Sequence, residues 1–274
     1  MDIRMIATDL DGTVIPIGGT APPFALDILA EAARQGICVV PATGRTLTAL
    51  PAEILGLSGI RYIISGNGAA VTDRVCGQRI YENLIPYEAA AQILEILVRY
   101  PVYTCVYMGD QPYNWEEIPD FLEKYYRNMS FFGRNPQRDL IASVRERKMN
   151  VEKIFVAVPD PEERRRLRTE FGGLPGIQIT SSSPRNLEFN RENASKGTAL
   201  AWLGEHLGIG PEYTLAMGDN ENDHSMLRYA GISLTPENGT EETKRLAGYI
   251  VPDAAEGGPV LFVREHALKR EEQG

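Results

Sequence analysis

The feature that most constrains the fold is the regular alternation of short apolar runs and helical stretches in the first part of the chain. Apolar runs at residues 3–8 and 37–41 flank a helical stretch at residues 22–35. A helical stretch at residues 47–55 and an apolar run at residues 61–64 continue the series. Strands that alternate with helices at this spacing form parallel sheets with right-handed crossovers. The sequence therefore predicts an α/β fold with a doubly wound parallel sheet.

The alternation is interrupted between Glu82 and about Asn190. In this stretch we expect helices at residues 86–100, 118–128 and 161–171 and strands at residues 102–108, 113–115, 151–158, 177–180 and 186–189. Strands that follow one another across short turns are typical of an antiparallel sheet. From Ser195 the alternation returns, with helices at residues 195–207 and 221–229 and strands at residues 213–217, 232–234 and 249–251.

We therefore predict two domains, because a chain of 274 residues is longer than one hydrophobic core usually organises. Residues 1–82 and 191–274 are expected to form the core, and residues 83–190 an inserted α+β domain with an antiparallel sheet. In open α/β sheets, ligands bind at the carboxyl ends of the strands. The candidate functional residues are accordingly sought just after each predicted core strand.

Composition limits the kind of partner. The net charge of −9 opposes non-specific attraction to nucleic acid or to anionic membranes, so we expect neither as a partner. The three cysteines, Cys38, Cys76 and Cys105, lack metal-ligand spacing and are odd in number, which favours a reducing, cytoplasmic location. The N-terminal segment lacks the apolar region of a signal peptide, and no apolar run has the length of a membrane span.

Two aspartates, Asp9 and Asp11, follow the first predicted strand one residue apart, directly before Gly12 and Thr13. At the end of a strand such a pair can converge, and two carboxylates that close raise each other's pKa unless a cation separates them. Taken alone, an Asp-x-Asp-Gly segment also fits an ordinary exposed turn. The pair becomes a candidate site because of three further segments.

Those three segments supply groups suited to a phosphate and a metal ion. Thr43-Gly44-Arg45 follows the second predicted strand and offers a hydroxyl and a backbone donor, although such a segment can also simply begin a helix. Lys196 stands at the start of a predicted helix, where it can neutralise a phosphate or lie in solvent. Residues 217–223 offer carboxylates and amides, which suit Mg²⁺ as hard oxygen ligands but also suit an ordinary first helical turn.

Together these segments resemble a known family. Asp9-Leu10-Asp11-Gly12-Thr13, Thr43-Gly44-Arg45, Lys196 and Gly218-Asp219-Asn220-Glu221-Asn222-Asp223 occur in the order and broad spacing of the four motifs of the haloacid dehalogenase superfamily of phosphohydrolases. Ser65-Gly66-Asn67-Gly68-Ala69 and Asn193-Ala194-Ser195-Lys196-Gly197-Thr198-Ala199-Leu200 are similar to the Cof-type subfamily, whose large cap is inserted between the second and third motifs. The resemblance covers essentially the whole chain, and the interruption after Glu82 lies at that place.

The resemblance implies a division of roles among three residues. It makes Asp9 the nucleophile and a Mg²⁺ ligand, and Asp11 the general acid and base that also binds the metal through its backbone carbonyl. Lys196 would offset negative charge on Asp9 and on the transferring phosphoryl group. The aspartyl phosphate is a mixed anhydride, which hydrolyses more readily than the starting ester. P-type ATPases, which preserve their aspartyl phosphate, carry threonine where this chain has Asp11, so the aspartate implies release of free phosphate.

The resemblance also implies which groups hold the phosphate and the metal. The phosphate-binding candidates follow strand ends or belong to the fourth motif: Thr43, Gly44, Arg45, Asn67 and Asn222. The metal ligands implied are all aspartates: Asp9, Asp11, Asp219 and Asp223.

We therefore expect a Mg²⁺-dependent phosphomonoester hydrolase that acts on a small phosphorylated metabolite, with sugar phosphates favoured. A phosphosugar mutase is the alternative enzyme, since a cap that retained a bisphosphate would support phosphoryl transfer. A binding protein that senses magnesium or phosphate is the alternative outside catalysis, but it would need neither Asp11 as an acid–base group nor Lys196 as a charge clamp. The oligomeric state is not predicted.

Some features fall outside these motifs. The segments at residues 233–240 and 252–258 depart from the usual sequences of the subfamily, and Asn238 is a candidate for its usual asparagine. His206 and His224 are interpreted as packing residues rather than catalytic bases. The aromatic residues of the inserted stretch are interpreted as core or, alternatively, as a wall on which a sugar stacks: Tyr107, Tyr113, Trp115, Tyr125 and Tyr126.

Overall fold

The computed structural model describes residues 1–126 and 134–269, and the chain folds into two compact units. The first, called here the core unit, comprises Met1–Gly44, Leu50–Tyr81 and the chain from Ser195 onward. The second, called the inserted unit, comprises Glu82–Ala194 together with the short segment Arg45–Ala49. This segment lies early in the sequence but groups with the inserted unit. The domain boundaries after residues 82 and 190 stay a prediction.

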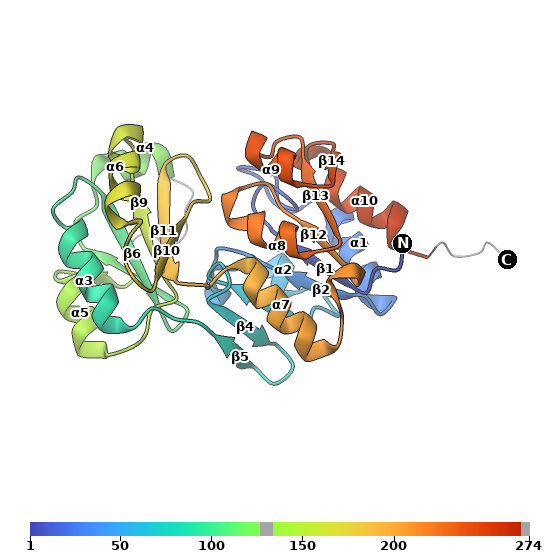
Figure 1. The fold of residues 1–274 in the computed structure, drawn as a ribbon, viewed down its shortest axis with the longest axis horizontal. Coiled ribbons are helices and arrows are strands. Elements are labelled where there is room, and N and C mark those ends of the chain that lie inside the picture. Colours follow the sequence, from blue (N-terminus) through green and yellow to red (C-terminus); the bar gives the residue numbers. More distant parts are fainter. Residues whose placement is uncertain (127–133, 270–274) are drawn as a thin grey trace. The chain divides into compact units, whose positions relative to one another are not determined.

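The core unit is built on a sheet of five strands: β1 (Met5–Thr8), β2 (Cys38–Pro41), β12 (Thr214–Met217), β13 (Ile232–Pro236) and β14 (Tyr249–Val251). Their order is β14-β13-β12-β1-β2, and every neighbouring pair is parallel (Figure 1). The predicted doubly wound parallel sheet is thereby confirmed. The strands β12, β1 and β2 are neighbours and run parallel, so the loops that follow them all leave the sheet at the carboxyl ends of the strands.

Helices cover both faces of this sheet: α1 (Pro23–Arg34), α7 (Lys196–Leu207), α8 (His224–Tyr229), α9 (Glu241–Leu246) and α10 (Gly258–His266). Short 3₁₀ turns join some of these elements: η2 (Pro211–Tyr213), η3 (Glu221–Asp223) and η4 (Ala254–Glu256). Met5 and Ala7 of β1 share a buried cluster with Leu200 of α7 and Met226 of α8. Since side chains alternate along a strand, the fully buried Ile6 points to the opposite face of the sheet. Helices α1 and α10 pack against each other.

The apolar run at residues 61–64 does not join the parallel sheet as a full strand. It forms β3 (Tyr62–Ser65) in a separate three-stranded sheet with β4 (Ala70–Asp73) and β5 (Gln78–Glu82), and β3 pairs antiparallel with β4. A single parallel bridge joins Ala42, just past β2, to Ile64. The chain reverses at Gly66, Asn67 and Gly68, whose φ angles are 59°, 61° and 92°. Successive residues in the left-handed conformation make a tight turn that reverses the chain, so β4 pairs antiparallel with β3. A crossover to a parallel strand would not need such a turn.

Residues 47–55, expected to form one helix, form two short pieces instead, η1 (Leu47–Ala49) and α2 (Ala52–Leu55). Pro51 separates them because it lacks a backbone N–H and disfavours helical conformation in the residue before it. Helix α10 is an element that the sequence pattern does not predict. It begins after Gly257, whose φ is 75°, with Gly258 and Pro259, residues that in a sequence indicate a turn.

The inserted unit contains a six-stranded sheet of order β10-β11-β9-β6-β7-β8. Its strands are β6 (Tyr103–Met108), β7 (Gln111–Trp115), β8 (Pro136–Gln137), β9 (Lys153–Ala157), β10 (Ile177–Thr180) and β11 (Asn186–Arg191). Its helices are α3 (Tyr87–Leu97), α4 (Asp120–Tyr126), α5 (Leu140–Arg147) and α6 (Pro161–Phe171). All strand pairs are antiparallel except β7 with β8, which confirms the predicted antiparallel sheet.

The sequence pattern does not indicate α5 or β8. Residues 127 and 128 of the predicted helix at residues 118–128 lie outside the described part of the chain. Helix α5 lacks a clear apolar stripe, because Arg145, Glu146 and Arg147 follow Val144 directly. Among the described residues, none of the helices has the length and apolar character that a membrane span requires.

Candidate active site

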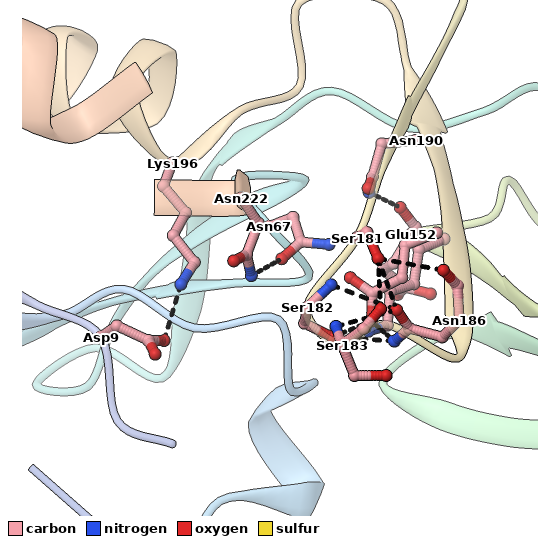
Figure 2. A network of polar contacts seen from close by, with 12 residues as sticks. Asp9, Asn67, Glu152, Ser181, Ser182, Ser183, Asn186, Asn190, Lys196 and Asn222 are labelled. Carbon is pink, nitrogen blue, oxygen red and sulfur yellow. Dashed lines mark hydrogen bonds and ion pairs between the residues drawn. The ribbon is translucent and has the colours of Figure 1, made fainter. Parts of the chain in front are cut away.

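The site begins with a buried lysine between two carboxylates. Lys196 is the first residue of α7, and its Nζ donates to Asp9 Oδ1 and to Asp223 Oδ1 at 2.6 Å each. Figure 2 shows the Lys196 side chain directed at Asp9. The side chains of Lys196 and Asp223 are fully buried, and that of Asp9 is 9% exposed. Lys196 is therefore an internal charge partner and not a solvated surface lysine.

The loop after β12 brings two further carboxylates to the same place. Asp223 Oδ2 accepts hydrogen bonds from the backbone N–H groups of Asp219 and Asn220, at 2.9 and 3.0 Å. Asp219 Oδ1 accepts a hydrogen bond from Thr13 Oγ1 at 3.1 Å. Ligand oxygens of Asp9, Asp219 and Asp223 all lie within 4.8 Å of one another. Asp223 thus binds Lys196 through Oδ1 and the backbone of its own loop through Oδ2, and it is also a member of this acidic group.

Burial dominates the electrostatics of this group. It raises the pKa of Asp9 well above its usual range; Lys196 opposes the rise, while Asp223 and Asp219 add to it. Burial and the charge of Asp223 raise the pKa of Asp219 to about 7. Burial alone would lower the pKa of Lys196, but Asp223 and Asp9 outweigh it and raise that pKa. With three carboxylates and one ammonium, the fully ionised group carries two excess negative charges, which a divalent cation would offset.

Asp11 lies outside this buried acidic group, as judged over the residues that the structure describes. It is exposed, in a tight turn in which the Leu10 carbonyl accepts from the N–H groups of Thr13, Val14 and Ile15. Gly12, with a φ of 92°, permits that turn, and an added Cβ there would lie 2.6 Å from Asp219 Oδ2. The turn thus places Asp11 next to the group while leaving its side chain accessible.

Three of the predicted phosphate-binding residues are joined by hydrogen bonds. The Asn67 backbone N–H donates to the Thr43 carbonyl at 3.0 Å, and Asn222 Nδ2 donates to Asn67 Oδ1 at 3.1 Å (Figure 2). All three residues are at most 9% exposed. Gly68 lets this turn approach α7, since an added Cβ would lie 2.1 Å from the Ser195 carbonyl oxygen. The β3–β4 turn therefore supports both the loop after β2 and the start of the helix that carries Lys196.

Gly44 and Arg45 fall on either side of the division between the units. Gly44 ends the first segment of the core unit, whereas Arg45 groups with the inserted unit. Arg45 Nη1 donates to the carbonyl oxygen of Ala49 at 3.0 Å, within its own segment. This contact holds Arg45 to the backbone of its own segment, and its phosphate-binding role stays a prediction.

Asn238 is a supporting residue that the sequence indicated only as a candidate for the subfamily's asparagine. Its Nδ2 donates to the Gly12 carbonyl at 2.8 Å, and its Oδ1 accepts from the Ala254 N–H at 3.0 Å. It therefore ties the turn after β1 to the variant loop at residues 252–258. Thr13, which follows the aspartate pair in sequence, donates to Asp219. No local pattern distinguishes these two roles, because both partners are distant in sequence.

The two histidines singled out from the sequence make their contacts away from these carboxylates. His224 Nε2 lies 2.9 Å from Thr243 Oγ1, and His206 stacks on Trp202 with ring centroids 5.1 Å apart. Their interpretation as packing residues agrees with these contacts.

The family follows from comparison with known proteins. A family model of haloacid dehalogenase-like hydrolases matches residues 6–262. This chain belongs to that family. The match spans the core strands, the acidic group and the whole inserted unit, which agrees with the resemblance indicated by the four motifs.

Named relatives of this hydrolase family extend over nearly the whole chain. The 5-amino-6-(5-phospho-D-ribitylamino)uracil phosphatase YcsE of Bacillus subtilis is 27% identical over 98% of this chain and 97% of its own length. Pyridoxal phosphate phosphatase YbhA of Escherichia coli is 24% identical over 98% of this chain and all of its own. The solved structure of the subclass IIB sugar phosphatase BT4131 shares the fold, with a TM-score of 0.82 and 21% identity over 96% of this chain and 98% of its own. This chain is thus a phosphatase of the haloacid dehalogenase-like hydrolase family.

Proposed function

We propose that this phosphatase hydrolyses phosphomonoesters of small metabolites in a Mg²⁺-dependent reaction that passes through a phosphorylated Asp9. The observation that carries the proposal is the buried contact of Lys196 with Asp9 and Asp223, with Asp219 in the same acidic group. A binding protein would gain nothing from holding a carboxylate against a lysine in the interior, because burying such a pair is costly. A nucleophile whose charge must be controlled gives that arrangement a purpose.

The donor set fits Mg²⁺. The ligand atoms of Asp9, Asp219 and Asp223 are carboxylate oxygens within 4.8 Å of one another, and Mg²⁺ prefers hard oxygen ligands. The excess negative charge and the raised pKa values of Asp9 and Asp219 are those of a site suited to a cation. We assign Asp9, Asp219 and the backbone carbonyl of Asp11 as ligands, with Asp223 completing the set. Bound there, the ion would supply positive charge to the transferring phosphoryl group.

The side chains then divide the chemistry. A carboxylate oxygen of Asp9 attacks phosphorus, the bond from phosphorus to the leaving oxygen breaks, and Asp11 gives its proton to that oxygen. Asp11 then takes a proton from water, which attacks phosphorus and releases inorganic phosphate and free Asp9. Thr43, the Gly44 backbone and Asn222 hold the phosphoryl oxygens, while Lys196 limits the charge on Asp9. The exposed turn position of Asp11 supports this role, since a proton carrier must reach both leaving group and water.

The substrate we favour is a sugar phosphate or a related polyol phosphate. YcsE is named for a substrate with a phosphorylated ribityl chain, and the neighbouring structure is named as a sugar phosphatase. YbhA is named for pyridoxal phosphate, so the family uses this core with different leaving groups. The substrate is therefore sought in a panel and not assigned from one relative.

The test is release of inorganic phosphate from pentose, hexose and alditol monophosphates, with and without Mg²⁺. Wild type is expected to release phosphate only with Mg²⁺, and Asp9→Asn to lose roughly a thousandfold or more. Asp27→Asn, on the exposed face of α1, is the matched control and should act as wild type. Transfer of phosphate only to a second sugar would support the mutase instead, and a silent panel with tight ligand binding would support a sensor.

Asp11→Asn tests the division of roles. Without the carboxyl group, water loses its general base, so the phosphorylated Asp9 should accumulate after a substrate with a good leaving group is added. Rapid acid quenching and intact-mass measurement would detect the added phosphoryl group. Hydrolysis at the wild-type rate would contradict the acid–base assignment.

A further inference from the structure

Helices α7 and α8 of the core unit pack against each other and come closest at their first turns (Figure 1). Gly197, the second residue of α7, is buried, and an added Cβ there would lie 2.4 Å from the carbonyl carbon and oxygen of Ser225 in α8. These are backbone atoms, which cannot move aside as the end of a side chain can. The two helices therefore meet at Gly197 and Ser225 with no room for a larger residue than glycine.

A hydrogen bond joins the two helices at the same point. The backbone N–H of Gly197 donates to Ser225 Oγ at 3.0 Å. The first N–H groups of a helix have no partner within the helix, so each needs an acceptor from outside it. Ser195, the residue before α7, accepts from the Thr198 N–H through its own Oγ at 3.1 Å. The first turn of α7 therefore depends on one hydroxyl of its own segment and on one hydroxyl of α8.

Lys196 directly precedes the residue that makes this contact. Its Nζ donates to Asp223 Oδ1 at 2.6 Å, and Asp223 lies two residues before Ser225. Two neighbouring residues of α7 are thus bonded to one short segment at the start of α8, Lys196 through its side chain and Gly197 through its backbone. The backbone bond fixes where the lysine side chain begins, and the bonds of Nζ fix where it ends.

The apolar contacts between the two helices lie further along α7. Leu200 and Leu203 share a buried cluster with Met226 and Leu227 of α8, but Leu200 already lies a full turn beyond Lys196. The end of a helix frays where its terminal groups are not bonded. Because Nζ lies within 2.6 Å of two carboxylates, a shift of about 1 Å in the first turn of α7 would break these contacts.

From these contacts we infer that Ser225 is a positioning residue for Lys196. Its hydroxyl holds the start of α7 at the place from which the lysine Nζ reaches both Asp9 and Asp223. The inference rests on the proposed function and deepens it, because Lys196 limits the charge on Asp9 during phosphoryl transfer. An interaction that is needed mainly in the transition state affects kcat rather than KM. Ser225 therefore acts on the rate of the chemical step through Lys196.

The experiment compares two alanine variants of the same helical turn. Ser225→Ala leaves the buried Gly197 N–H without its acceptor, so it should lower kcat for the best ester of the panel about tenfold and change KM by no more than about twofold. Ser195→Ala is the matched control, because it removes a hydroxyl whose partner, Thr198, belongs to α7 itself. Both variants should lower the melting temperature by about 2–4 °C, but the control should keep kcat within about twofold of wild type.

Equal losses of kcat in the two variants, a loss confined to KM, or no loss in Ser225→Ala would overturn the inference. If Ser225→Ala does not fold, as judged by its melting curve, Ser225→Cys replaces it, since a thiol is a weaker acceptor and should lower kcat in the same selective way.

Failure of the proposed function is seen separately, as no phosphate release by wild type from any ester. In that case acylation of lysine amines by acetic anhydride, mapped by mass spectrometry, decides. The fully buried Lys196 of wild type should react far more slowly than the exposed Lys148. Ser225→Ala should raise the rate at Lys196 about tenfold and Ser195→Ala no more than about twofold. An unchanged rate at Lys196 in Ser225→Ala overturns the inference.

Discussion

At the scale of single residues, the chemistry depends on charges that are buried in balance. Lys196 is fully buried and contacts Asp9 and Asp223, so its removal leaves two carboxylates without their cation. We expect Lys196→Met to lower the free energy of unfolding of the metal-free protein by about 3–5 kcal/mol, the usual cost of an unpaired buried charge. Urea titration at neutral pH measures this loss, and phosphate release should fall with it.

Lys244→Met provides the control for the Lys196 substitution. Lys244 forms an exposed pair with Glu241 one helical turn away, at 3.0 Å, with the glutamate side chain 81% exposed. Such pairs contribute about 0.5 kcal/mol or less, so this variant should unfold as wild type does. A Lys196→Met variant as stable as the control would show that the buried pair does not hold the loop after β12 to β1.

The residues of the acidic group were predictable from sequence only because strand ends in a parallel sheet converge. Asp9, Asp219 and Asp223 each follow a strand and lie together as expected. Lys196 carries only a weak local signal, since a lysine in the first turn of a helix is most often solvated; the resemblance to the family strengthened it. Asn238 and Thr13 bond to residues far away in sequence, so their roles became visible only in the fold.

At the scale of elements, the β3–β4 turn depends on a glycine at position 68. Gly68 combines a φ of 92° with a place for Cβ only 2.1 Å from the Ser195 carbonyl oxygen, and the nearest atoms there belong to the backbone. Gly68→Ala should therefore cost more than about 3 kcal/mol and shift the start of α7, and with it Lys196, enough to lower kcat/KM by about tenfold or more. Thermal unfolding and phosphate release measure the two effects.

Gly77→Ala is the control for Gly68→Ala, because it introduces the same kind of backbone strain without a steric clash. Gly77 also has a positive φ, 68°, but nothing lies within 4 Å of an added Cβ. Gly77→Ala should cost only the conformational penalty of about 1–2 kcal/mol and leave activity unchanged. Equal effects of the two substitutions would mean that the contact of the turn with α7 does not position Lys196.

The types of most elements were predictable from periodicity, while their ends and breaks were not. The helix at residues 161–171 has the predicted bounds because Asp160 caps it and Pro161 begins it. The stretch at residues 47–55 breaks at Pro51, which a periodic pattern does not register. The pairing of β3 depends on three left-handed residues in succession, and an apolar run of four residues does not reveal its partners.

At the scale of the whole molecule, the parallel sheet and the antiparallel sheet have separate hydrophobic clusters among the described residues. One buried cluster contains Met5, Val40 and Ala216 of the parallel sheet, and a separate cluster contains Val106 and Ile154 of the antiparallel sheet. The strand–helix alternation predicted the parallel sheet, and its interruption predicted the antiparallel one, because the two kinds of sheet have different sequence patterns. The grouping of residues 45–49 with the inserted unit was not predictable, since it depends on contacts such as that of the Leu47 N–H with Asp110 Oδ1, at 3.2 Å.

The three thiols report on this division, since Cys38 lies in the parallel sheet, Cys105 in the antiparallel sheet, and Cys76 is exposed. Burial raises the pKa of Cys38 to about 11 and that of Cys105 to about 12, and only the thiolate reacts. Native protein at about pH 8 should therefore react with a disulfide reagent at Cys76 alone. The stability from keeping the thiols of Cys38 and Cys105 protonated is present below about pH 9 and declines as the pH rises towards 11.

Cys38 packs against a hydrophobic cluster of the parallel sheet, and Cys105 lies within a separate cluster of the antiparallel sheet, so the reactivity of each thiol follows the unfolding of its own sheet. We expect Cys38 and Cys105 to become reactive at different urea concentrations, since separate clusters give each sheet its own cooperative transition. Pulsed alkylation and mass mapping across a urea series measure both midpoints, and Cys76→Ser removes the background label without touching either core. Coincident midpoints would show that the two cores unfold as one, so that the inserted unit depends on the core unit for its stability.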